Sequence, residues 1–92
     1  MTREKFYEDF LNHLDYLTAK AHEENRLYHT DADELERKLD EIKLFAPENV
    51  YVAAKKLFNY NLSHYRDHSP SSLAGFAVVR KQYIDATKND IN

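Results

Sequence analysis

Apolar residues recur along the chain at the spacing of an α-helix. The first stripe has intervals of three and four residues, which places its members on one face of a helix. It consists of Tyr7, Phe10, Leu14, Leu17 and Ala21. Thr2 precedes the stripe as an N-cap, and the apolar pattern resumes at Leu27 and Tyr28 after a polar gap. The pattern therefore predicts a first helix over residues 3–28.

Three further stretches show the same periodicity. Thr30 or Asp31 caps a second helix, which we expect over residues 31–46. Pro47 interrupts that helix and suits the first position of a third, over residues 47–66. Because almost no linker separates these two helices, we expect them to meet at a steep angle. Ser69 and Pro70 form an N-cap and a first helical position, which predicts a fourth helix over residues 70–89.

The inward face of each later helix follows from the same spacing. For the second helix it comprises Leu35, Leu39, Ile42 and Phe45. For the third it comprises Val50, Ala53, Ala54, Leu57 and Phe58, with Leu62 or Tyr65 beyond them. For the fourth it comprises Leu73, Phe76, Ala77, Val79, Tyr83 and Ile84. Gly75 weakens the fourth helix, so we expect a neighbouring backbone to cross closely there.

The scarcity of turn residues supports an all-α fold. The chain has 92 residues with one glycine and two prolines, whereas an all-β fold needs many sharp turns. A length of 92 residues suits one domain. We therefore expect a compact four-helix bundle formed by a single helical domain, residues 1–92.

Charge is distributed unevenly between the two halves of the chain. Residues 1–46 carry seven basic and twelve acidic side chains, a net charge of −5, and residues 47–92 carry six basic and four acidic, a net charge of +2. We expect the acidic half to pack against the basic half and to steer helix pairing. The total net charge of −3 is far less basic than is typical of a nucleic-acid-binding domain.

Membrane and secretory signals are missing from the sequence. After residues 1–5 charges recur too often for the apolar stretch of a signal peptide. The longest apolar runs, such as residues 76–79, are far shorter than the roughly 20 residues of a membrane span. Without cysteine the chain forms no disulfide or thiolate metal site. We expect a cytoplasmic protein that does not engage a membrane.

Two histidines are the only hint of metal binding. His64 and His68 are four residues apart, so a helix would place both imidazoles on one face. A zinc site needs three or four ligands, and neither cysteine nor an HExxH motif supplies the others. A metal-binding regulatory protein using these two histidines stays as an alternative.

Catalytic signatures are not found. The sequence has no nucleophile elbow, phosphate-binding loop or carboxylate pair suited to acid–base chemistry. The serines lie at helix ends, where backbone capping explains them. We expect neither an enzyme nor a cofactor.

Tyrosines outside the apolar stripes suggest a protein-binding surface. Tyr16 lies among polar residues of the first helix, and several candidates lie on the outer side of the third. Arg80 emerges from an apolar stripe, and it either pairs with a carboxylate such as Asp15 or Asp40 or awaits an acidic group from a partner. The candidate partner-binding residues are Tyr16, Tyr51, Lys55, Lys56, Asn59, Tyr60 and Arg80.

These features favour a non-catalytic intracellular module that binds another protein. In size, acidity and lack of motifs the chain resembles the small accessory proteins of bacteria and phages, such as inhibitors, antitoxins and immunity proteins. The likeness is one of general design and implies no particular residues. Weak nucleic-acid binding is a further alternative, and the small core leaves room for a homodimer.

Overall fold

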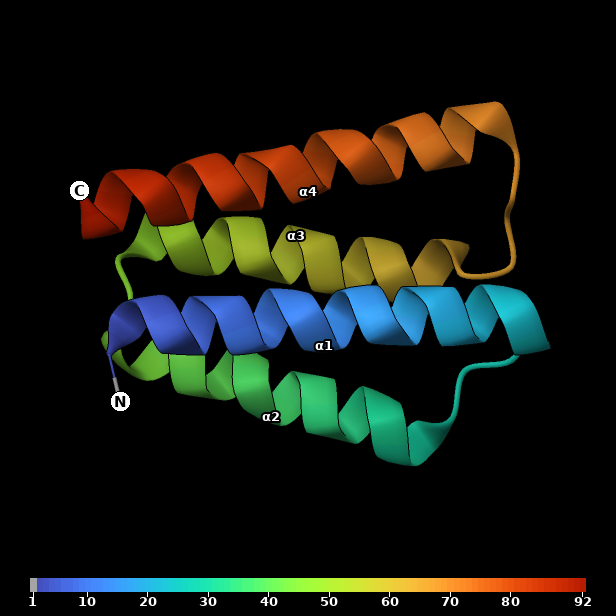
Figure 1. Ribbon diagram of the computed structural model, residues 1–92, viewed down its shortest axis with the longest axis horizontal. Helices are drawn as coiled ribbons and strands as arrows, with labels where there is room; N and C mark the ends of the chain where they lie inside the picture. Colours follow the sequence, from blue (N-terminus) through green and yellow to red (C-terminus); the bar gives the residue numbers. More distant parts are fainter. Residues whose placement is uncertain (1) are drawn as a thin grey trace.

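The computed structural model describes residues 2–92, and that part of the chain forms four helices. They are α1 (Arg3–Glu24), α2 (His29–Phe45), α3 (Glu48–His64) and α4 (Pro70–Ile91). Consecutive helices run in opposite directions, so the molecule is an all-α, up-and-down four-helix bundle (Figure 1). The predicted fold class is confirmed.

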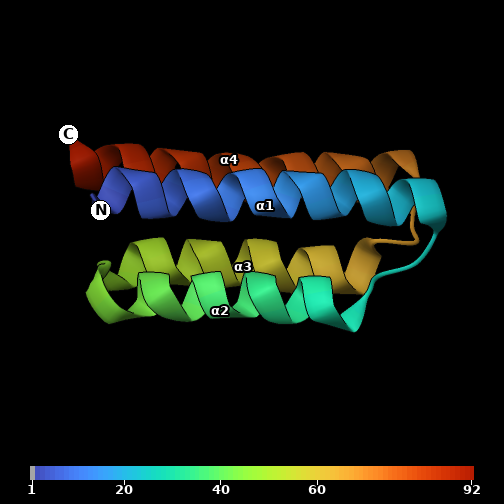
Figure 2. The same cartoon turned by 60° about the horizontal axis from the view of Figure 1, so that its bottom comes forward.

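The helices form two layers, α1 beside α4 and α2 beside α3 (Figure 2). α1 and α3 therefore lie at diagonally opposite corners, and their outward faces look in different directions. Both chain ends lie at one end of the bundle (Figure 1). None of the helices within residues 2–92 has the length and apolar character needed to cross a membrane.

α1 is shorter than predicted. Asn25 adopts left-handed backbone angles, φ 51° and ψ 37°, and its N–H bonds to the carbonyl of Ala21. Asparagine tolerates this conformation, which ends a helix. Leu27 and Tyr28 therefore lie in the connection to α2, and the expected extension to residue 28 is wrong.

The start of α2 also differs from the prediction. α2 begins at His29 and its N-cap is Tyr28, which makes no side-chain capping bond. Asp31 instead accepts a hydrogen bond from Lys20 of α1 at 2.9 Å. Asp31, which the sequence pattern offered as an N-cap, therefore joins α2 to α1.

The steep angle expected between α2 and α3 is wrong, because the two helices are antiparallel neighbours (Figure 1). Ala46 and Pro47 are both extended, with ψ near 151° and 154°, and this reverses the chain within two residues. Pro47 is consequently the N-cap of α3 and not its first helical residue. At the next junction, Ser69 caps α4 as predicted and accepts a hydrogen bond from the Ser72 N–H.

The predicted apolar stripe of α1 is fully buried, as are most of those of α2 and α3. The face of α4 differs from the prediction, because Leu73 and Ala77 are exposed while Ser72, Tyr83 and Thr87 are buried. Apolar residues surround much of α4, so their spacing does not specify which side faces inward. Hydrogen bonds from Tyr83 and Arg80 to α1 fix that side instead.

Candidate binding surface

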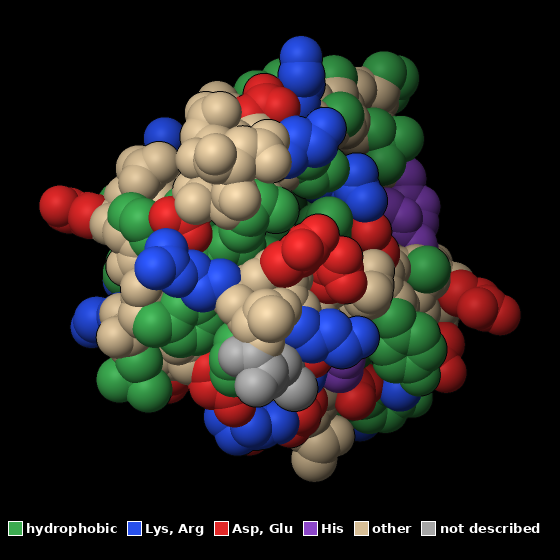
Figure 3. Space-filling view, turned by 60° about the vertical axis from the view of Figure 1, so that its left-hand side comes forward, with side chains coloured by type: hydrophobic (Ala, Val, Ile, Leu, Met, Phe, Trp, Pro, Cys, Tyr) green, Lys and Arg blue, Asp and Glu red, His purple; other side chains and the backbone are tan. Residues whose placement is uncertain are grey.

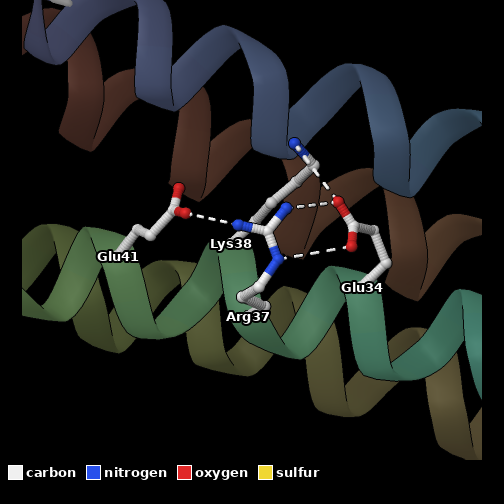
Figure 4. A network of polar contacts seen from close by, with 4 residues as sticks. All are labelled: Glu34, Arg37, Lys38 and Glu41. Atoms are coloured by element: carbon white, nitrogen blue, oxygen red, sulfur yellow. Dashed lines mark hydrogen bonds and ion pairs between the residues drawn. The ribbon is translucent and has the colours of Figure 1, made fainter.

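Four of the six Lys and Arg side chains of α1 and α2 are held by carboxylates of the same two helices. Lys5 lies 3.6 Å from Asp9, and Lys20 lies 2.9 Å from Asp31. On α2 a network joins four side chains at one-turn spacing (Figure 4). Its members are Glu34, Arg37, Lys38 and Glu41. The positive charge on this half of the bundle is therefore largely neutralised within it.

α3 and α4 carry exposed lysines that have no carboxylate partner in the part of the chain that the structure describes. Lys56 of α3 and Lys81 of α4 are exposed, and neither forms an ion pair with any carboxylate in residues 2–92. Exposed valines lie on the same helices, Val52 with 44% and Val78 with 56% of its surface accessible.

Val52 and Lys56 border a shallow groove between α3 and α4, whereas Val78 and Lys81 lie on α4 outside its lining. The groove is lined by Val52, Lys56, Gln82 and Ala86, and also by the acidic Glu48. We define the α3–α4 face by its exposed and groove-lining side chains. They are Val52, Lys56, Val78, Lys81, Gln82 and Ala86. Apolar centres beside unpaired cations give a surface that suits an acidic partner with apolar side chains.

The end of the bundle that carries both termini differs from this face. Figure 3 turns that end toward the viewer, and acidic and basic side chains alternate over it with hydrophobic ones between them. The acidic Asp90 there is engaged by Arg3 at 2.9 Å. Neither acidic nor basic side chains dominate the surface seen in Figure 3, so this end would discriminate less between acidic and basic partners than the α3–α4 face.

Five of the seven predicted residues lie on α3, and they differ in exposure. Lys55, Lys56 and Asn59 are exposed as expected. Tyr51 is half-buried at the α2 edge, where the ammonium groups of Lys43 and Lys55 lie 5.6 and 6.0 Å from its ring centre. These distances suit cation–π attraction, which places Lys55 beside Tyr51 on the α2 side of α3.

The expected outward position of Tyr60 is wrong. Its hydroxyl donates a hydrogen bond to the carbonyl of Ser72 at 2.8 Å, and its ring stacks on His64. A Cβ added to Gly75 would overlap the same hydroxyl. A side chain, and not the backbone predicted from sequence, therefore requires glycine at position 75, and Tyr60 joins α3 to α4.

Tyr16 and Arg80 do not lie with the predicted residues of α3. Tyr16 is 56% exposed, but it lies on α1, diagonally across the bundle from α3. Arg80 donates two hydrogen bonds to the carboxylate of Asp15, at 2.7 and 3.1 Å. This contact raises the pKa of the Arg80 guanidinium. The predicted pairing with Asp15 is confirmed, and it occupies the guanidinium within the chain.

The two predicted histidines pack against different aromatic rings. His64 stacks on Tyr60 with ring centres 4.0 Å apart, whereas His68 packs against His22 of α1 at 4.4 Å. Burial, and then the charge of His68, lower the pKa of His22. Within residues 2–92, no three His, Asp or Glu side chains are placed to share a metal ion.

Two polar positions in the structure were not anticipated from sequence. Asp90 lies beyond the predicted end of the last helix, yet it accepts hydrogen bonds from Tyr7 at 2.6 Å and from Arg3. The bond from Tyr7 is the main cause that lowers the pKa of Asp90, while burial followed by the same bond raises the pKa of Tyr7 to about 12. Asn61 is the second such position, and it is buried where the α3 stripe calls for an apolar residue.

The fold thus defines the chain only as a four-helix bundle, with exposed valines and, within residues 2–92, two lysines without ion-pair partners on α3 and α4. Comparison with known protein families, with characterised proteins and with solved structures finds no match to this chain.

Proposed function

We propose that this protein is a non-catalytic interaction module that binds an acidic protein surface through the α3–α4 face. The observation that carries the proposal is the presence of Lys56 and Lys81 without ion-pair partners beside exposed Val52 and Val78. Six other Lys and Arg side chains form ion pairs within residues 2–92, whereas these two lysines do not. The six are Arg3, Lys5, Lys20, Arg37, Lys38 and Arg80.

The two kinds of side chain would contribute differently to binding. Unpaired lysines steer an acidic partner and accelerate association, mostly as rim charges. The valines and the groove supply apolar area, whose burial contributes roughly 25 cal/mol per Å² before the costs of association. Because the face lies on two helices joined by the Tyr60–Ser72 hydrogen bond, it is preorganised and little ordering is required.

Charge reversal on the face tests this proposal. We expect Lys56→Glu combined with Lys81→Glu to weaken binding at least tenfold to a partner purified after affinity capture from the native host. Wild-type binding should weaken as salt concentration rises, because exposed charge interactions are screened. The control is Lys43→Glu combined with Lys5→Glu, which changes the net charge equally but lies on α2 and α1. Circular dichroism establishes that each variant folds.

Three outcomes would refute the proposal. The first is equal binding by the α3–α4 variant and the wild type. The second is equal loss in the control variant, which would show a response to net charge alone. The third is capture of nucleic acid as the principal ligand, with affinity that falls steeply with salt.

A further inference from the structure

Asn61 breaks the apolar stripe of α3 in the interior of the bundle. Its relative exposure is 3%, and it follows Val50, Ala54 and Leu57 on the inward face of the helix. A buried amide without partners costs about 1–3 kcal/mol. Both the amide nitrogen and the carbonyl oxygen of this side chain therefore need hydrogen-bond partners.

The orientation of the amide is determined by its neighbour. The hydroxyl of Thr18 donates its hydrogen to the carbonyl of Leu14 at 2.8 Å, so the same oxygen can only accept from Asn61. The amide nitrogen must consequently face Thr18, and the carbonyl oxygen Oδ1 faces elsewhere. Among residues 2–92, no group donates a hydrogen bond to this buried oxygen.

Asn61 lines a small cavity, partly open to solvent, between α1, α3 and the first turn of α4. The cavity has a volume of about 20 Å³. Roughly 10–15 Å³ is needed to accept one water molecule, so one water fits and two do not. The other polar side chains that line it include those of Thr18, His22, His64 and Ser72.

His64 supplies a second acceptor near the same place. Its Nδ1 lies 3.2 Å from the carbonyl of Tyr60, and a carbonyl can only accept, so Nδ1 carries the proton. In the tautomer that carries this proton, Nε2 keeps a lone pair that can accept a hydrogen bond. A ligand for this cavity needs hydrogens to donate and about the volume of one water, which excludes an apolar guest or an anion without hydrogens.

We infer that the cavity is a specific binding site for one long-lived water molecule, which donates a hydrogen bond to Asn61 Oδ1. Polar side chains from the α1 and α4 sides complete its contacts. The water joins α1, α3 and the start of α4 at the end of the bundle opposite the chain termini. Buried waters of this kind make about three hydrogen bonds and are costly to remove.

Water–protein NOE spectroscopy on the ¹⁵N-labelled protein tests the inference. A water that stays for longer than the tumbling time gives cross-peaks to the Asn61 side-chain amide with the sign of NOEs within the protein. Asn61→Leu, which replaces the amide with an apolar group of similar volume, should abolish water cross-peaks to the backbone N–H groups around the cavity. Asn59→Leu changes an exposed asparagine on the same helix and should preserve them.

Absence of a long-lived water signal at Asn61 in the folded wild type would overturn the inference, as would persistence of the local signals in Asn61→Leu. If Asn61→Leu does not fold, the wild-type spectrum and a crystal structure at about 1.5 Å resolution decide the matter. A cavity without density for water beside Oδ1 would also contradict the inference.

Discussion

Gly75 and Tyr60 form a contact whose energy is open to direct measurement. The space where Gly75 would carry a Cβ is occupied by the Tyr60 hydroxyl, and that position is 3.0 Å from the ring carbon Cζ. The hydroxyl cannot shift freely, because it donates a hydrogen bond to the carbonyl of Ser72. Gly75→Ala must therefore displace the ring and weaken this bond.

The expected magnitude follows from three contributions. Alanine in place of glycine within a helix stabilises by about 1 kcal/mol. Loss of the hydrogen bond costs about 1 kcal/mol, and forcing an extra methyl group into a packed contact costs about 1–3 kcal/mol. Gly75→Ala should therefore lower the free energy of unfolding by about 1–3 kcal/mol, and each kcal/mol corresponds to a decrease of about 4–8 °C in Tm.

A double-mutant cycle separates the contact from helix propensity. In the Tyr60→Phe background the hydroxyl is gone, and Gly75→Ala should be close to neutral, which gives a coupling energy of about 2 kcal/mol. Ala74→Gly is the control, because this exposed position in α4 should lose about 1 kcal/mol in both backgrounds. Urea unfolding followed by circular dichroism supplies the free energies. Stabilisation by Gly75→Ala in the wild type, or equal effects in both backgrounds, would refute this explanation.

Periodicity predicted the helices well where the apolar residues lie on one side. The stripe of α1 is buried along its whole length, because its five members leave only one apolar face. α4 has apolar residues on several sides, and polar contacts decide its rotation, so the sequence pattern misplaced Leu73 and Ala77. Helix ends depended on single backbone angles, such as that of Asn25, which periodicity does not encode.

The candidate site was predictable only in part. Charge and spacing placed Lys55, Lys56 and Asn59 on the exposed side of α3, as the structure has them. The inward role of Tyr60 was not predictable, because it depends on the first turn of α4, twelve residues away. Asn61 could have been noticed as a polar residue at a stripe position, although its link to Thr18 requires the three-dimensional fold.

Three further predictions concern stability. Arg80→Met should lower the free energy of unfolding by about 0.5–1 kcal/mol in urea, because it removes a half-exposed ion pair with Asp15. It should leave partner binding unchanged, and a loss of binding would contradict a purely structural role for Arg80. Burial and His68 lower the pKa of His22 below its usual 6.5, so the unfolded chain binds the proton more tightly and stability should fall as pH drops below about 6.5. His22→Gln should reduce this pH dependence, and an unchanged profile would exclude His22 as its source. Leu44→Gln should change stability by less than about 0.5 kcal/mol, since Leu44 is 87% exposed; unfolding midpoints check this.

Only two ion pairs among residues 2–92 join the acidic half of the chain, residues 1–46, to the basic half, residues 47–92. Arg80 reaches Asp15 from the basic half, while Arg3 reaches Asp90 in the opposite sense. These pairs join α1 to α4 without involving Lys56 or Lys81. The two lysines therefore contribute little to the fold, and reversing their charge should change stability far less than it changes association. That separation makes the α3–α4 face testable as a binding surface, because a loss of binding there would not follow from a loss of structure.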